Sequence, residues 1–202
     1  MRLQVYSICK RLLDITGAGV GLALFSPAIV VIAVLVRRDG GPVFYKATRV
    51  GRYGIPFSMY KFRTMIMNAD KVGGSSTADD DPRLTAVGRR LRRHKLDELP
   101  QLINVVKGEM SLVGPRPQIQ WAVDLYTAEE RALLSVRPGM TDYASLQFAN
   151  EGEILKGSVD PDADYLEKIH PKKMQLGLDY IKNRSLSTDL SILAQTFITV
   201  FR

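Results

Sequence analysis

The sequence is almost free of cysteine, since Cys9 is the only one in 202 residues. A single thiol excludes an internal disulfide and any zinc site built from cysteines. The two histidines, His94 and His170, show no metal-ligand spacing. No glycine-rich phosphate loop is present, and no Ser-His-Asp order is convincing. The usual sequence signatures of zinc proteins, P-loop enzymes and triad hydrolases are therefore missing.

Acidic residues are also in deficit, with 21 Asp and Glu against 28 Lys and Arg. The resulting net charge of +7 and pI near 9.6 favour an anionic partner, such as nucleic acid, lipid headgroups or a phosphorylated substrate. The length suits a single domain with a core of useful size. We find no internal repeat.

Residues 15–36 contain no charged side chain. As a straight helix this run would be roughly 33 Å long, enough to span the hydrocarbon core of a bilayer. No persuasive signal-peptidase site follows it, so we expect the segment to be retained. Basic residues flank both of its ends: Lys10 and Arg11 precede it, and Arg37 and Arg38 follow it. The positive-inside rule would place both ends on the cytoplasmic side.

Ser26 and Pro27 lie at the midpoint of this run. Pro27 has no amide hydrogen, so the carbonyl of Ala23 loses its helical partner and the helix tends to kink. The Ser26 hydroxyl is placed to satisfy that carbonyl locally. Two topologies stay open. A bent, re-entrant helix would enter and leave by the cytoplasmic face, whereas a straight span would put the rest of the chain on the opposite side.

The remaining pattern predicts short strands and helices. We expect strands at 43–51 and 55–65 around a turn at 51–54, followed by a polar loop at 73–82. Helices should follow at 83–95 and from about 100 to 108, and then a short strand that ends in a rigid loop at 111–117. We further expect a short helix at 127–134, a turn at 137–140, and a mostly helical stretch at 161–183 with a break near Pro171. Asp79, Asp80 and Asp81 fit a solvated loop better than a cation site.

The last segment predicts a helix that starts at a Ser187 or Thr188 cap. Its apolar residues fall near one face: Leu190, Leu193, Phe197, Ile198 and Phe201. We expect this face to pack on the core, with the membrane interface as the alternative.

Asp97 and Glu98 are adjacent carboxylates, preceded by a run of cations that includes Arg92 and Lys95. We expect them at a helix N-terminus, where the macrodipole and free amides favour ionised carboxylates. The neighbouring cations act in the same direction. An acid pair kept anionic suits a nucleophile or a metal ligand. The alternative is a plain helix cap with a surface ion pair.

Three further cations are candidates for phosphate binding. Arg116 lies between two prolines in GPRP, so its guanidinium is held on a stiff loop and can grip phosphate with two hydrogen bonds. Lys61 and Arg63 alternate along a predicted strand and should point to one face. An exposed turn and a solvated edge strand are the plain alternatives.

Four stretches resemble the bacterial sugar transferase family, the monotopic polyprenyl-phosphate phosphoglycosyl transferases. They are KFRTM (61–65), LDELPQLINVVKGEMSLVGPRP (96–117), RPGMT (137–141) and LDYIKN (178–183). The resemblance extends from about residue 8 to 200. It implies an α+β, membrane-associated fold, with a re-entrant, Ser-Pro-kinked membrane helix in residues 1–40. Residues 41–202 would form a compact cytoplasmic catalytic domain of mostly helices with short strands, including amphipathic interfacial helices, at the bacterial inner membrane.

The resemblance also implies a reaction. A phosphosugar would move from a UDP-sugar to undecaprenyl phosphate with release of UMP, as the first membrane step of surface-glycan synthesis. Asp97 matches the nucleophile of a covalent phosphosugar intermediate and would contact a Mg²⁺ cofactor, and Glu98 matches its partner. Lys61, Arg63, Arg92 and Arg116 match basic positions of the site. Membrane lipids would be further partners, and nucleic acid would not.

Two alternatives remain at this stage. A membrane-anchored basic adaptor would explain the charge but not the acid pair, and direct displacement would dispense with the covalent step. The chain also departs from many relatives, which follow the RPG turn with Gly-Trp where this sequence has Asp142 and Tyr143. That departure leaves the sugar open.

Overall fold

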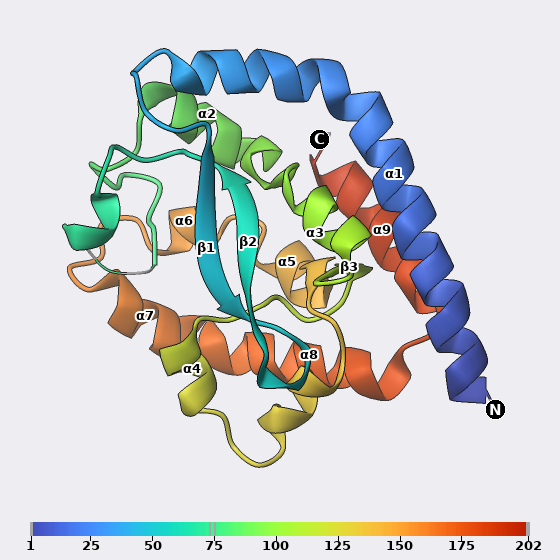
Figure 1. Ribbon diagram of the computed structural model, residues 1–202. Coiled ribbons are helices and arrows are strands. Elements are labelled where there is room, and N and C mark those ends of the chain that lie inside the picture. Colours follow the sequence, from blue (N-terminus) through green and yellow to red (C-terminus); the bar gives the residue numbers. More distant parts are fainter. Residues whose placement is uncertain (1, 73, 75, 201–202) are drawn as a thin grey trace.

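A computed structural model describes residues 2–72, 74 and 76–200 of the chain. It is rich in helices with a few short strands, as the α+β prediction requires. Figure 1 shows the long helix α1 (Arg2–Arg37) running along two sides of a domain that holds a β-hairpin near its centre. The predicted division near residue 40 falls in the turn between α1 and the hairpin.

Helix α1 bends in its middle, as Figure 1 shows. Pro27 lies inside the helix, and the Ser26 Oγ donates a hydrogen bond of 2.8 Å to the carbonyl oxygen of Ala23. The hydrogen bond expected from the sequence is thereby confirmed. Residues Gln4–Arg37 are long and apolar enough to cross a membrane, by length and composition. That test does not distinguish a straight span from a re-entrant helix.

Both halves of α1 contact the same domain. In the first half, Arg11 donates to the carbonyls of Val105 (2.7 Å) and Val106 (2.9 Å), at the end of helix α3 (Gln101–Lys107). In the second half, Ile32 and Val36 are buried in a cluster with Phe62 and Leu91, two other residues of the domain. The two ends of the helix are therefore tied to one body.

A buried group of polar side chains, which we call the polar clasp, joins the first half of α1 to the C-terminal helices. It consists of Tyr6, Lys10, Tyr180 and Asp189. The Asp189 carboxylate is fully buried and accepts hydrogen bonds from Tyr6 (3.0 Å) and Tyr180 (2.8 Å). Its Oδ2 lies 3.1 Å from Lys10 Nζ. A charge buried in this way is retained only with such partners.

The predicted hairpin is confirmed. Strands β1 (Phe44–Val50) and β2 (Pro56–Phe62) pair antiparallel around a 3-10 turn, η1 (Arg52–Gly54). Ala47 lies opposite Met59, and both are buried in the core formed with α1 and α3.

Two predicted helices are shorter than expected. Helix α2 (Ala86–Arg93) begins at Thr85 because its Oγ1 accepts a hydrogen bond of 2.9 Å from Gly88 N, which caps the helix there. Gly88 packs directly on Thr64, two residues after β2 ends. A Cβ at position 88 would lie 1.9 Å from the carbonyl oxygen of Thr64. The predicted helix at 127–134 is instead a 3-10 segment, η4 (Glu130–Ser135).

The expected turn at 137–140 is partly wrong. Strand β4 (Gly139–Thr141) pairs in parallel with β3 (Ser111–Val113), and Gly139 lies against the backbone of Gly114. Short helices not expected from the sequence are α4 (Gln120–Asp124), α5 (Tyr143–Gln147) and α6 (Glu151–Ile154). The predicted helical stretch at 161–183 divides into α7 (Pro161–Lys168) and α8 (His170–Asn183), with Pro171 in the first turn of α8.

Helix α9 (Leu186–Val200) starts earlier than predicted. The Ser185 Oγ accepts a hydrogen bond from Thr188 N at 3.1 Å, so Ser185 is the capping side chain. Leu190, Phe197 and Ile198 are exposed, whereas Ile192 is fully buried. The prediction of core packing is therefore wrong for most of the apolar face that the sequence indicated, and Phe201 lies outside the described residues.

Candidate active site

The acid pair lies in a 3-10 turn, η3 (Leu96–Glu98), and not in the first turn of α3 as predicted. Pro100 has no amide hydrogen to bond the Leu96 carbonyl, which instead accepts from Leu99 N at 3.3 Å. Lys95 enters the turn at φ +54°. Asp97 and Glu98 therefore precede α3 by one 3-10 turn.

Glu98 is the centre of an ion-pair group. Arg116 grips its carboxylate with a fork, from Nη1 to Oε2 at 2.9 Å and from Nη2 to Oε1 at 2.7 Å. Lys61 Nζ donates to Oε1 at 3.0 Å. Burial alone would raise the pKa of Glu98, but the charges of Arg116 and Lys61 outweigh it and hold that pKa well below its usual range. Glu98 is therefore an anion whose charge is neutralised twice.

Asp97 differs from Glu98 in its hydrogen bonding and in the direction in which its pKa is shifted. Its side chain is only 4% exposed, yet its carboxylate makes no hydrogen bond or ion pair within the ranges 2–72, 74 and 76–200. Burial raises the pKa of Asp97, with Lys61 and Arg92 opposing the shift and the negative charge of Glu98 adding to it. Desolvation thus acts against the ionised form of Asp97, a contribution that the expectation from the helix terminus and neighbouring cations left out.

An unbonded carboxylate in a cationic setting can take a metal ion. No group of three or more His, Cys, Asp or Glu side chains that could hold one occurs in the part of the chain that the structure describes. Mg²⁺, however, is commonly held by one or two carboxylates together with substrate phosphates and water. The residues present fit a magnesium ion shared between Asp97 and a phosphorylated ligand, and they do not fit an all-protein cage.

The structure does not bring Arg63 to this acid pair. Arg63 is buried and donates to Asp39 and to the carbonyls of Val36, Pro42 and Met65. These contacts use its five N–H donors. Hydrogen bonding from Arg63 lowers the pKa of Asp39 to about 2. The contacts place Arg63 as a tie between β2 and the end of α1, with no donor left for phosphate.

Arg92 lies close enough to the acid pair for the charge of its guanidinium to act on Asp97 and oppose the rise of its pKa. Arg92 lies in the last turn of α2, which the contact of Gly88 with Thr64 holds against the hairpin. Of the four cations predicted for the site, Lys61, Arg92 and Arg116 therefore surround the acids.

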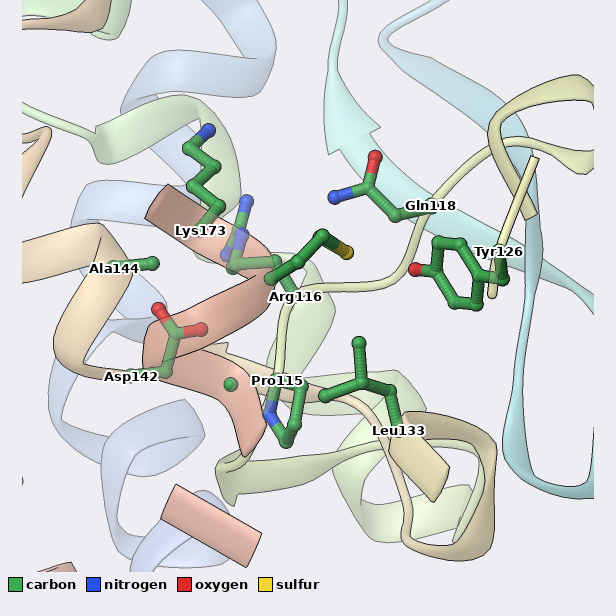
Figure 2. A pocket seen from close by; sticks show the side chains of 10 residues that line it. Pro115, Arg116, Gln118, Tyr126, Leu133, Asp142, Ala144 and Lys173 are labelled. Atoms are coloured by element: carbon green, nitrogen blue, oxygen red, sulfur yellow. The ribbon is translucent and has the colours of Figure 1, made fainter. Parts of the chain in front are cut away.

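Asp142 lies on the other side of Arg116, in a wall of a small cavity. Figure 2 shows Arg116 rising between Lys173 and Gln118, with Asp142 across from Pro115. The cavity measures about 10 Å³, room for roughly one water molecule. The Asp142 carboxylate accepts hydrogen bonds of 2.7 Å from the backbone and hydroxyl of Ser145, capping α5. The signal in the sequence that could have indicated this role is an Asp three residues before a Ser, a pattern that can cap a helix.

Tyr143 packs against the buried cluster of Val113, Tyr180 and Ile192. The Asp142-Tyr143 pair is thus a helix cap followed by a core residue. The acidic loop forms no cation site in the described residues: Asp81 pairs with Arg83, and Asp80 accepts a hydrogen bond from Gly157 N.

Comparison with known proteins gives a match over nearly the whole chain. The family model described as bacterial sugar transferase covers residues 5–202. The chain is 38% identical over 208 residues to an undecaprenyl-phosphate galactose phosphotransferase of Salmonella typhimurium, across 96% of this chain and 40% of that protein.

Two further relatives differ in length. A UDP-N-acetylgalactosamine-undecaprenyl-phosphate N-acetylgalactosaminephosphotransferase of Aeromonas hydrophila is 36% identical, across 97% of this chain and 44% of its own length. An uncharacterized sugar transferase, EpsL, of Bacillus subtilis is 40% identical, across 94% of this chain and 85% of its own length. The chain thus spans less than half of the two named phosphotransferases and most of EpsL.

Proposed function

Because the chain belongs to the bacterial sugar transferase family, we propose that it transfers a phosphosugar from a UDP-sugar to undecaprenyl phosphate. The relatives named for galactose and N-acetylgalactosamine phosphotransfer support this substrate class. The observation that carries the proposal is the contrast within the acid pair. Glu98 is held by Arg116 and Lys61, whereas the Asp97 carboxylate has no hydrogen bond within the described part of the chain and is available to attack.

In the proposed first step, an Asp97 oxygen attacks the phosphorus that carries the sugar. A bond forms between that oxygen and phosphorus, the bond from phosphorus to the UMP oxygen breaks, and UMP leaves with the electron pair. In the second step an oxygen of undecaprenyl phosphate attacks the same phosphorus, and Asp97 departs as a carboxylate. Two displacements of this kind make a covalent aspartyl-phosphosugar intermediate and a ping-pong scheme.

The cations reduce the repulsion between the Asp97 carboxylate and the diphosphate of the substrate. Arg116 spends three donors on Glu98 and the carbonyl of Met140, which leaves Nε–H and one Nη2 hydrogen for a substrate phosphate. Arg92 adds positive charge beside Asp97. Glu98 holds Arg116 and Lys61 in fixed positions, and such preorganised charges stabilise a phosphoryl transition state without reorganisation. A bound Mg²⁺, held by Asp97 and substrate phosphates, would neutralise negative charge on the diphosphate.

The half-reaction tests this function. Purified protein with Mg²⁺ and a panel of UDP-sugars that includes UDP-galactose and UDP-N-acetylgalactosamine should release at most one UMP per enzyme without lipid. Adding undecaprenyl phosphate should start continuous UMP release. A basic adaptor would release none under either condition. Continuous release only with lipid, and no stoichiometric release before it, would point to direct displacement.

We also propose that α1 is re-entrant and that the domain faces the cytoplasm at the bacterial inner membrane. The ties at both halves of α1 support this topology. Arg11 contacts the end of α3, and Val36 packs beside Phe62. A straight span would carry these two contacts to opposite faces of a bilayer roughly 30 Å thick. The exposed apolar face of α9 supports contact with the membrane interface.

Labelling of single introduced cysteines should show that the start of α1 and the domain lie on the same side of the membrane. In a Cys9→Ser background, Val5→Cys and Val159→Cys add thiols at two exposed positions, one near the start of α1 and one in the domain. A membrane-impermeant maleimide should react with either thiol only after the inner membrane is permeabilised. Reaction of only one of the two thiols in intact spheroplasts would establish a straight span, and the Cys9→Ser parent measures background.

A further inference from the structure

The inner face of the hairpin carries one cation that the site described above does not use. Side chains alternate along a strand, so Tyr45, Ala47 and Arg49 share a face of β1. Ala47 is buried against the core, which identifies this face as the inner one. Lys61, directly opposite Tyr45, extends from the same face of the hairpin to Glu98. Arg49 therefore lies on the side of the sheet that faces the acid pair.

A backbone contact fixes the other end of this face beside Arg116. The amide of Val50 donates a hydrogen bond of 2.9 Å to the carbonyl of Gln118. Gln118 is two residues from Arg116, on the loop stiffened by Pro115 and Pro117. The two guanidiniums are close enough for Arg116 to lower the pKa of Arg49 by repulsion, in addition to a larger lowering by burial.

Arg49 has no acidic partner. No carboxylate lies within 4 Å of its guanidinium among the residues that the structure describes, and the guanidinium makes one hydrogen bond, from Nη1 to the carbonyl of Thr48 at 2.9 Å. Tyr45 and Tyr165 are its other neighbours, through their phenol groups. Four of its five N–H donors are therefore without a protein acceptor.

Four neighbouring cations, by contrast, each have a carboxylate partner. Lys61 and Arg116 share Glu98, Arg63 is paired with Asp39, and Lys173 is paired with Glu151. A partly buried guanidinium next to a second one, with no carboxylate, costs free energy in the free protein. An arriving anion removes that cost, and phosphate matches the planar fork of arginine.

We propose that Arg49 binds a phosphate group of the transferase's substrates, together with the free donors of Arg116. This inference rests on the proposed function. The phosphate has two possible sources, the diphosphate of the UDP-sugar and the monophosphate of the lipid carrier. Both present the same chemistry to two guanidiniums, and the two half-reactions separate them.

Arg49→Gln tests the proposal, because glutamine keeps a polar side chain but loses the charge and the fork. UMP release from UDP-sugar without lipid is measured first, and discharge of the loaded enzyme by undecaprenyl phosphate second. A fall of at least tenfold in the single-turnover rate constant for UMP release assigns the nucleotide diphosphate. Normal UMP release with discharge slowed at least tenfold assigns the lipid phosphate.

Lys46→Ala is the control, since it removes a cation from the exposed face of the same strand and should leave both half-reactions unchanged. Arg49→Lys keeps the charge and should recover part of the lost rate. It replaces Arg49→Gln as the test variant if the glutamine variant does not fold. Wild-type rates in both half-reactions for folded Arg49→Gln or Arg49→Lys would overturn the inference. Failure of the wild-type enzyme to release UMP would instead overturn the proposed function.

Discussion

Asp97→Asn should abolish turnover, with a fall of several orders of magnitude in kcat. Asparagine has nearly the shape of aspartate but lacks the anionic oxygen that would form the bond to phosphorus. The substitution also removes a carboxylate that makes no hydrogen bond in the folded protein, so little native contact is lost. We therefore expect the variant to fold with a melting temperature close to that of the parent. A large loss of activity in a stable protein is the signature of a lost nucleophile.

Mass spectrometry of the half-reaction measures the same point directly. Wild-type protein incubated with UDP-sugar and Mg²⁺ should gain the mass of one phosphosugar, on the peptide that contains Asp97. Undecaprenyl phosphate should remove it, and Asp97→Asn should never carry it. The acyl phosphate hydrolyses readily, so stoichiometric UMP release is read alongside the mass. Asp124→Asn is the control, because the one side-chain hydrogen bond of this acid within the described residues is to Gln120. An adduct on Asp97→Asn would overturn the assignment.

Arg116→Lys should lower kcat/KM at least about tenfold, or roughly 1.4 kcal/mol of transition-state stabilisation. Lysine keeps the charge but loses the fork on Glu98, the bond to the Met140 carbonyl and the free Nε–H. Steady-state kinetics on the purified protein measures the effect. Arg131→Lys, at an exposed position, provides the matched control. Unchanged kinetics for Arg116→Lys would mean that the GPRP loop is only structural.

A double variant separates the two tasks of Arg116. Glu98→Gln removes the carboxylate that both Arg116 and Lys61 contact. If Arg116 acts only by holding Glu98, the losses from Glu98→Gln and Arg116→Lys should overlap, and the pair should cost little more than the worse single change. If Arg116 also grips phosphate, the double variant should be slower than either. The cycle thus distinguishes positioning from direct contact with substrate.

The features predicted correctly from the sequence are those set by neighbours in the chain. The hairpin follows from alternation and the turn at 51–54, and the bond from Ser26 to Ala23 follows from the missing amide of Pro27. Asp97 and Glu98 stood out as a motif, and the structure gathers Lys61, Arg92 and Arg116 around them. Local chemistry accounts for the hairpin and the Ser26 bond, whereas Lys61 and Arg116 reach Glu98 from 37 and 18 residues away in the sequence.

The features missed depend on contacts between distant segments. Nothing near Arg63 in the sequence indicates that Asp39 and the end of α1 would use all its donors. The parallel pairing of 111–113 with 139–141 likewise joins segments that no local pattern relates. The pKa of Asp97 could not be predicted because its burial is a property of the folded chain. Arg49 lies in the strand predicted at 43–51, and its alternation with Ala47 places both side chains on one face.

The polar clasp has a consequence for the order of events during synthesis on the ribosome. Tyr6 and Asp189 are 183 residues apart in sequence. At about 5–20 residues per second, helix α1 emerges roughly 10–40 s before its buried partner exists. During that interval Lys10 has no Asp189 carboxylate to pair with. The first part of α1 therefore acquires its contacts in the polar clasp only after the last helix has been made.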